Sequence, residues 1–166
     1  MTVKNITDGA GVIRPTFYNY YQDKNELFEY ILERDLFAFL ENLISVDLLG
    51  EVVSMIFIYF DRHMAFYQRA FETEGQNSFE EILTLKMTAL VERIFDQYPM
   101  RDFEAVSFFS SQSISHYYGI VTVIIIKLWL QEGTKRNTDV DQVISAYKFF
   151  ATHSFDDVID IENPNY

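Results

Sequence analysis

The sequence predicts an all-α protein, and two patterns support this fold class. Apolar residues recur every three or four positions along most of the 166-residue chain, which is the period of an amphipathic helix. Glycine, proline and helix-capping residues interrupt the pattern at intervals of one helix length. No segment has the two-residue period of a β-strand, and no internal repeat stands out. The chain is therefore expected to fold as packed helices around one main core.

The first twenty residues predict two short helices joined by a tight turn. Thr2 can cap the first helix, and Gly9–Gly11 can end it because glycine adopts the left-handed conformation of a sharp reversal. The second helix begins near Pro15, a residue favoured in a first helical turn. Its inward side chains are expected to be Val12, Phe17 and Tyr21, and its exposed ones Arg14, Thr16, Tyr18, Asn19 and Tyr20. A helix, a glycine turn and a polar-faced helix are typical of a helix-turn-helix DNA-binding motif.

The rest of the chain predicts longer helices in close succession. They are expected at about 24–46, 49–60, 64–72, 78–98, 102–132 and 138–152. Ser78 and Glu81 form a capping box, and Asp102 can cap the longest helix. The breaks fall at His63, Gly75–Asn77, Pro99 and Gly133. We expect a head with its connecting helix at 1–46, a helical body at 47–154 and an acidic tail at 155–166.

The run AGVIRPTFYNYYQDKNELF resembles the DNA-binding signature of the tetracycline-repressor (TetR) family, A-G-V-S-x-[GP]-T-[FL]-Y-x-[YH]-F-x-[SDN]-K-x-x-L. The matching positions are the Ala-Gly-Val turn, Thr16–Tyr18, the aromatic pair Tyr20–Tyr21, and Asp23–Lys24 at the start of the next helix. The resemblance covers about thirty residues, and the rest of the chain agrees in size and helical layout.

This resemblance implies a dimeric regulator of transcription, and a repressor by family tendency. Each subunit would place its second helix in the major groove of a palindromic operator in double-stranded DNA. A small-molecule effector in the body would change the separation of the two heads and release the DNA. Arg14 and Thr16 would contact base edges or nearby phosphates, with Asn19 on the same face. Thr2, Tyr18, Tyr20 and Lys24 would hold the DNA backbone.

Two departures from the family pattern affect the expected DNA head. Ile13 stands where relatives carry a capping serine, which weakens the start of the second helix by about 1 kcal/mol. The family also has a helix before the position of Thr2, whereas this sequence begins at Met1. We expect either a start further upstream or a shortened head that binds DNA weakly. The alternative function is a ligand-binding or dimer-forming interaction protein without a working DNA head, and upstream in-frame codons would discriminate between the two.

Charge and composition exclude several other classes. The net charge is −12, but residues 1–24 carry +1, so the acidic excess lies in the body and tail. An acidic body orients the molecule head-first toward DNA and weakens non-specific binding. Without cysteine there is no disulfide framework and no thiol nucleophile. The longest apolar run, Gly119–Ile126, is too short to cross a bilayer, and no signal peptide is apparent, so we expect a cytoplasmic protein with no membrane partner.

Aromatic residues make up 17% of the chain, including sixteen phenylalanines and eleven tyrosines. One interpretation is that they fill a helical core. The other is an apolar effector pocket with a few polar groups, because a buried tyrosine hydroxyl needs a hydrogen-bond partner. The candidate pocket residues are Tyr59, His63, Tyr67, Gln112, His116 and Tyr117.

The last two long helices predict a homodimer interface. Ile120–Leu130 is apolar around most of its circumference, as expected for a helix buried on two sides, although a core helix in a monomer is the alternative. Related repressors dimerise through their last two major helices. The candidate interface residues are Val121, Ile125, Leu128, Trp129, Val140, Val143, Ile144 and Tyr147.

Catalytic and metal-binding patterns are weak. His63 and His116 lie on different expected helices without a second ligand at helical spacing, so we expect no metal site. Serines precede His116, but no G-x-S-x-G motif accompanies them and no glycine-rich phosphate loop occurs. We therefore predict neither an enzyme nor a cofactor.

Overall fold

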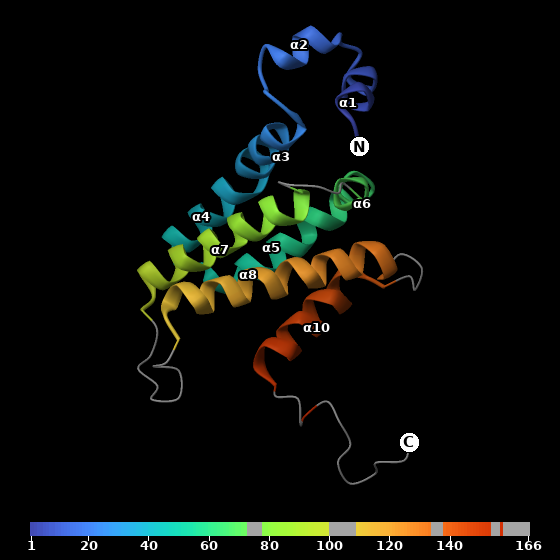
Figure 1. The fold of residues 1–166 in the computed structure, drawn as a ribbon. Coiled ribbons are helices and arrows are strands. Elements are labelled where there is room, and N and C mark those ends of the chain that lie inside the picture. The colour runs from blue at the N-terminus through green and yellow to red at the C-terminus, as the bar shows by residue number, and fades with distance from the viewer. Residues whose placement is uncertain (73–77, 100–108, 134–137, 154–156, 158–166) are drawn as a thin grey trace.

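The computed structural model describes residues 1–72, 78–99, 109–133, 138–153 and 157, and all regular structure in these ranges is helical. The all-α fold class is thereby confirmed. Figure 1 shows two short helices at one end of the molecule and longer packed helices below them. The helices are α1 (Val3–Ala10), α2 (Arg14–Tyr18), α3 (Lys24–Leu32), α4 (Ala38–Ser45), α5 (Leu49–Arg62), α6 (Met64–Phe71), α7 (Phe79–Gln97), α8 (Ser111–Leu128) and α10 (Val140–Thr152).

One continuous helix connects the two ends of the molecule, as the sequence predicted for residues 24–46. It consists of α3, the π-helical turn η1 (Glu33–Phe37) and α4. Its inward face carries large apolar side chains that are almost fully buried: Phe28, Leu32, Leu36, Leu40 and Ile44. The N-terminal helices are thus linked to the body by a rod whose lower half packs against α5 and α7.

Side-chain caps begin several of the helices. Ser78 Oγ accepts from the backbone N–H of Glu81 at 3.3 Å, and the Glu81 carboxylate accepts from the backbone N–H of Ser78 at 3.2 Å, so the predicted capping box is confirmed. Asp139 caps α10. Asp102, predicted to cap the longest helix, lies outside the described residues, as do the loop 75–77 and all of the tail except Asp157. α8 begins at Ser111, after the capping residue Ser110, and therefore later than the start at 102 that the sequence predicted.

An aromatic cluster joins the connecting helix to α6 and α7. The ring of Phe79 lies 5.4 Å from that of Phe28, 5.3 Å from Tyr67 and 4.9 Å from Phe71, measured between centroids. Phe79, Phe28 and Tyr67 are at most 1% exposed. Many of the aromatic residues therefore fill the core, as one of the two interpretations expected.

Within the described residues one helix, Ser111–Glu132, is long and apolar enough to cross a membrane, although the sequence analysis found no sufficient run. It packs along α7, and Lys127 Nζ lies 2.6 Å from a carboxylate oxygen of Glu80 on that helix. The helix begins with polar residues, including Ser111, Gln112 and Ser113. Packing against α7 buries part of its apolar surface, and the remainder, including Ile120, Ile124 and Leu128, is exposed.

The contact between α7 and α8 depends on the absence of a side chain at Gly119. A Cβ at this position would lie 2.6 Å from Thr88 Oγ1 and 3.0 Å from the Thr88 backbone nitrogen. Real Cβ atoms do not approach backbone so closely without a shift of the helices. Gly119 is therefore required for close packing of the two helices.

Gly119→Ala is expected to lower the free energy of unfolding by about 1–3 kcal/mol, because the added methyl group forces α7 and α8 apart. Urea denaturation measures this change. Gly50→Ala in α5 is the matched control: nothing lies within 4 Å of its added Cβ, so it should be neutral or stabilising by up to about 1 kcal/mol. Equal effects of the two substitutions would contradict the packing argument.

Candidate functional site

The N-terminal helix α1 has a capped start and a glycine-terminated end. Thr2 Oγ1 accepts from the backbone N–H of Asn5 at 3.3 Å. Gly11 adopts φ 65°, and its N–H donates to the Asp8 carbonyl at 3.3 Å, while the N–H of Val12 donates to the Thr7 carbonyl at 3.0 Å. These bonds satisfy the last carbonyls of α1 and reverse the chain. The predicted cap and turn are both confirmed.

The second helix, α2, begins without a side-chain cap at Ile13, as its isoleucine predicted, and carries Pro15 in its first turn. Phe17 is 6% exposed and its ring contacts those of Tyr18 and Tyr21, while α2 as a whole packs against α1. Val12, expected to face inward, is 41% exposed, because the Gly11 turn directs the chain outward before α2 begins.

The expected DNA-contacting side chains surround α2. Tyr18 and Tyr20 are 57% and 74% exposed, and Arg14 and Asn19 are also exposed. Thr16 is half-buried, and the Thr2 hydroxyl is already engaged in capping α1. Lys24 is half-buried at the first position of α3, after the capping residue Asp23. The exposed surface of α2 thus offers hydrogen-bonding and cationic groups on a short, anchored helix.

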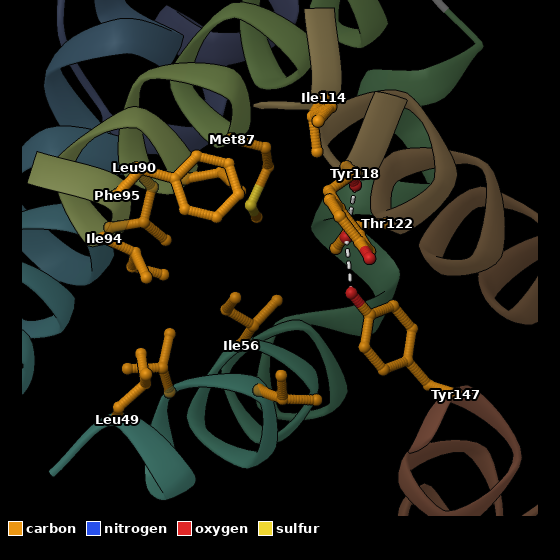
Figure 2. A pocket seen from close by; sticks show the side chains of 13 residues that line it. Leu49, Ile56, Met87, Leu90, Ile94, Phe95, Ile114, Tyr118, Thr122 and Tyr147 are labelled. Carbon is orange, nitrogen blue, oxygen red and sulfur yellow. Dashed lines mark hydrogen bonds between the residues drawn. The ribbon is translucent and has the colours of Figure 1, made fainter. Parts of the chain in front are cut away.

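A pocket of about 540 Å³ lies in the body between α5, α7, α8 and α10. Figure 2 shows aliphatic side chains from α5 and α7 on two of its sides and a column of α8 residues opposite them. The lining residues are Leu49, Val52, Val53, Ile56, Met87, Leu90, Val91, Ile94, Phe95, Ile114, Tyr118, Thr122 and Tyr147. This size and composition are typical of small-molecule sites.

The polar atoms of the pocket meet where α8 faces α10. Thr122 Oγ1 lies 2.8 Å from the Tyr118 carbonyl oxygen and 2.9 Å from Tyr147 Oη (Figure 2). Burial raises the pKa of the Tyr147 phenol above its ordinary value, although the hydrogen bond with Thr122 opposes this shift. The phenol is therefore neutral at physiological pH, and none of the lining residues is charged.

Of the six residues predicted to form the pocket, Tyr59, His63 and Tyr67 contact one another, but the six do not line one cavity. Tyr59 and His63 line a depression beside the connecting helix, and Tyr67 is buried in the core with its hydroxyl 2.5 Å from that of Tyr59. Burial raises the pKa of Tyr67 well above its ordinary value. The other three lie on α8 away from the pocket: Gln112 near the end of α7, His116 beside Thr88, and Tyr117 at 61% exposure.

Helical spacing explains this difference. The pocket uses Ile114, Tyr118 and Thr122, which lie four residues apart and share one face of α8. Gln112 and His116 are each two residues from a pocket residue, which places them on the opposite side of the helix. The spacing of Ile114, Tyr118 and Thr122 is visible in the sequence and could have identified the face of α8 that lines the pocket.

The residues predicted for a dimer interface have four different surroundings. Trp129, Val143 and Ile144 are 5%, 6% and 8% exposed and are buried within their own chain. Val121, Ile125 and Val140 are half-buried, and Tyr147 lines the pocket. Leu128 is 50% exposed and lies on the α8 stripe, which we define as the exposed apolar residues Tyr117, Ile120, Ile124 and Leu128. Their spacing of three or four residues places them along one face.

The histidines and acidic residues that the structure describes are spread over the molecule rather than clustered. Among these described residues, no group of three histidine, aspartate or glutamate side chains is placed to hold a metal ion. His63 and His116 lie at separate surfaces.

Comparison with known proteins adds two findings. Residues 48–140 match the family model of a TetR-type transcriptional regulator C-terminal region. The chain is also 34% identical over 106 residues to the HTH-type dhaKLM operon transcriptional activator DhaS of Lactococcus lactis subsp. lactis (strain IL1403). That match covers 62% of this chain and 54% of DhaS, so it spans about half of the relative's length. No solved structure matches the chain.

Proposed function

The chain belongs to the TetR family of transcriptional regulators, and we propose that it binds a palindromic DNA operator as a homodimer and is released by a small-molecule effector. The observation that carries this proposal is the form of the N-terminal helices. A capped helix, a left-handed glycine turn and a short anchored helix leave Arg14, Tyr18 and Tyr20 exposed. Such a helix can enter a major groove.

The charge distribution supports head-first approach to DNA. Residues 1–24 carry +1 within a chain of net charge −12. We propose that Arg14 and Thr16 contact base edges or nearby phosphates and that Tyr18, Asn19, Tyr20 and Lys24 hold the backbone. Thr2 would act through its cap on α1, because its hydroxyl and its backbone N–H both donate to the side chain of Asn5.

The α8 stripe supports the homodimer. Its four apolar side chains are between 36% and 61% exposed on one face of the longest apolar helix. A second copy related by a twofold axis would cover this stripe with its own. The two heads of such a dimer would then read the two half-sites of a palindrome. Of the interface residues predicted from the sequence, Leu128 belongs to the α8 stripe.

The position of the pocket supports control of the head by an effector. Two of its walls, α5 and α7, pack against α4, which continues through η1 and α3 to the head. A ligand that fits one separation of these walls better than another would favour one position of the connecting helix. We propose that the ligand-bound position changes the spacing of the two heads and lowers operator affinity.

Repression by operator occupancy is the proposed direction of control, with the protein acting in the cytoplasm. Activation is the second candidate, because DhaS is described as an activator. A reporter placed behind the selected operator distinguishes them, since deletion of the regulator raises expression under a repressor and lowers it under an activator.

For the whole chain we propose a head and connecting helix at 1–46, a ligand-binding and dimerisation body at 47–154, and an acidic tail at 155–166.

The head residues are tested by DNA binding. Duplexes selected from a random library serve as operators, and binding is followed by fluorescence anisotropy across a salt series. Arg14→Ala is expected to cost about 1–3 kcal/mol and to relax sequence preference, because base readout is lost. Tyr18→Ala is expected to weaken binding to all sequences alike, because it removes a backbone contact.

Lys148→Ala is the matched control, since it removes one positive charge from an exposed position on α10, far from the head in sequence. It should leave operator affinity unchanged. If selection recovers no preferred sequence and the variants bind DNA like the native chain, the DNA-reading proposal fails and the alternative of an interaction protein without a working head gains support.

A further inference from the structure

The polar atoms of the pocket lie together at one end, and this placement restricts the chemistry of its ligand. The walls from α5 and α7 offer only aliphatic, aromatic and thioether side chains, whereas the hydroxyl-bearing lining residues Tyr118, Thr122 and Tyr147 belong to α8 and α10, and the hydroxyls of Thr122 and Tyr147 meet between these helices (Figure 2). Among the residues that the structure describes, no acidic or basic side chain lines the pocket. A charged ligand would lose its hydration without gaining a counter-ion. The pocket therefore favours a neutral ligand.

Thr122 and Tyr147 each carry one hydroxyl proton, and their hydrogen bonds determine which acceptor each proton faces. The Tyr118 carbonyl oxygen, 2.8 Å from Thr122 Oγ1, can only accept a hydrogen bond. The Thr122 hydroxyl therefore donates to this carbonyl. Tyr147 Oη, 2.9 Å from Thr122 Oγ1, then donates to Thr122. With its proton engaged, Tyr147 Oη has only lone pairs left for a ligand.

We propose that the pocket selects a neutral, mostly apolar molecule that carries one hydroxyl or N–H group, and that this group donates to Tyr147 Oη. The inference rests on the proposed effector role of the pocket and names the chemical class of the effector. A volume of about 540 Å³ accommodates a ligand of ordinary drug-like size. At Tyr147 Oη, an ether of the same shape would bring an acceptor against an acceptor and lose this hydrogen bond.

Three probes of similar length test this selectivity: 1-decanol, methyl nonyl ether and decanoate. Binding to the full chain is measured by isothermal titration calorimetry and by the fluorescence of Trp129, the single tryptophan. Its ring lies 6.0 Å from that of Phe57, which lies 5.4 Å from the ring of Tyr147, so it is close enough to report occupancy. The alcohol is expected to bind roughly tenfold more tightly than the ether, and decanoate most weakly.

Substitution of the two hydroxyl-bearing residues gives a sharper test. Thr122→Val preserves shape but releases the Tyr147 proton, so that an alcohol and an ether can both accept from it, and the preference for the alcohol is expected to be lost. Tyr147→Phe removes the proposed acceptor and is expected to lower decanol affinity roughly tenfold. Thr84→Val is the matched control, because Thr84 Oγ1 also donates to a carbonyl four residues earlier but lies outside the pocket. It should keep the native preference.

Several results would overturn the proposal: equal binding of alcohol and ether, tightest binding of decanoate, no binding of any probe, or an unchanged preference in Thr122→Val. If Thr122→Val does not fold, the native selectivity and Tyr147→Phe still decide. These measurements involve no DNA. If the probes bind with the expected selectivity but bound decanol does not change operator affinity, the proposed effector response is contradicted and the ligand class is not. If decanoate alone releases the operator, the ligand class is contradicted.

Discussion

Phe79→Ala is expected to lower the free energy of unfolding by about 3–5 kcal/mol, the cost of removing a fully buried phenylalanine from a packed core. Phe79 is 0% exposed and contacts the rings of Phe28, Tyr67 and Phe71. Those contacts join the connecting helix to α6 and α7, so the loss should also loosen the attachment of the head. Urea or thermal denaturation followed by circular dichroism measures the change.

Phe39→Ala is the control for this substitution, because Phe39 lies on the connecting helix but is 48% exposed. It removes the same number of atoms with much less loss of burial, and we expect an effect below about 1.5 kcal/mol. Comparable destabilisation by the two variants would show that the aromatic cluster does not dominate the attachment of the connecting helix.

Local chemistry explains why helix boundaries could be predicted from the sequence. Thr2, Ser78 and Asp139 cap helices with their own side chains, and Gly11 turns the chain with a positive φ. Each of these interactions involves residues within four positions of one another, so the sequence contains all the partners. The π-helical turn η1 lies in a stretch without such a signal, and the sequence analysis expected an unbroken helix there.

Tertiary packing explains why the pocket and the buried faces could not be assigned in the same way. Tyr67 and Tyr147 both carry a hydroxyl on an apolar helical face, yet one is buried in the core and the other lines the pocket. Periodicity identifies which face of a helix is apolar, but not whether the neighbouring helix fills the space opposite it. Tertiary packing likewise explains why Val143 is buried against its own chain whereas Ile124 remains 43% exposed.

Ile124→Glu is expected to convert the proposed dimer into a folded monomer. The side chain lies in the middle of the α8 stripe and is 43% exposed in a single chain, so glutamate there meets water when the chain is alone. In a twofold dimer the substitution buries an unpaired charge from each subunit. Burying the two charges costs about 4 kcal/mol in total, so the dissociation constant should rise roughly a thousandfold. Sedimentation velocity over a concentration series measures the change.

Two further variants separate dissociation from unfolding. Val143→Glu, at a residue that the sequence placed in the candidate dimer interface, should instead unfold the chain, because Val143 is only 6% exposed and the charge would enter its own core. Val46→Glu, at a position 54% exposed and outside the α8 stripe, should leave both assembly and stability unchanged. Operator binding should fall with dimerisation in Ile124→Glu, since a monomer contacts one half-site. A native chain that sediments as a monomer at micromolar concentration, or an Ile124→Glu variant that remains dimeric, would show that the α8 stripe is not the interface.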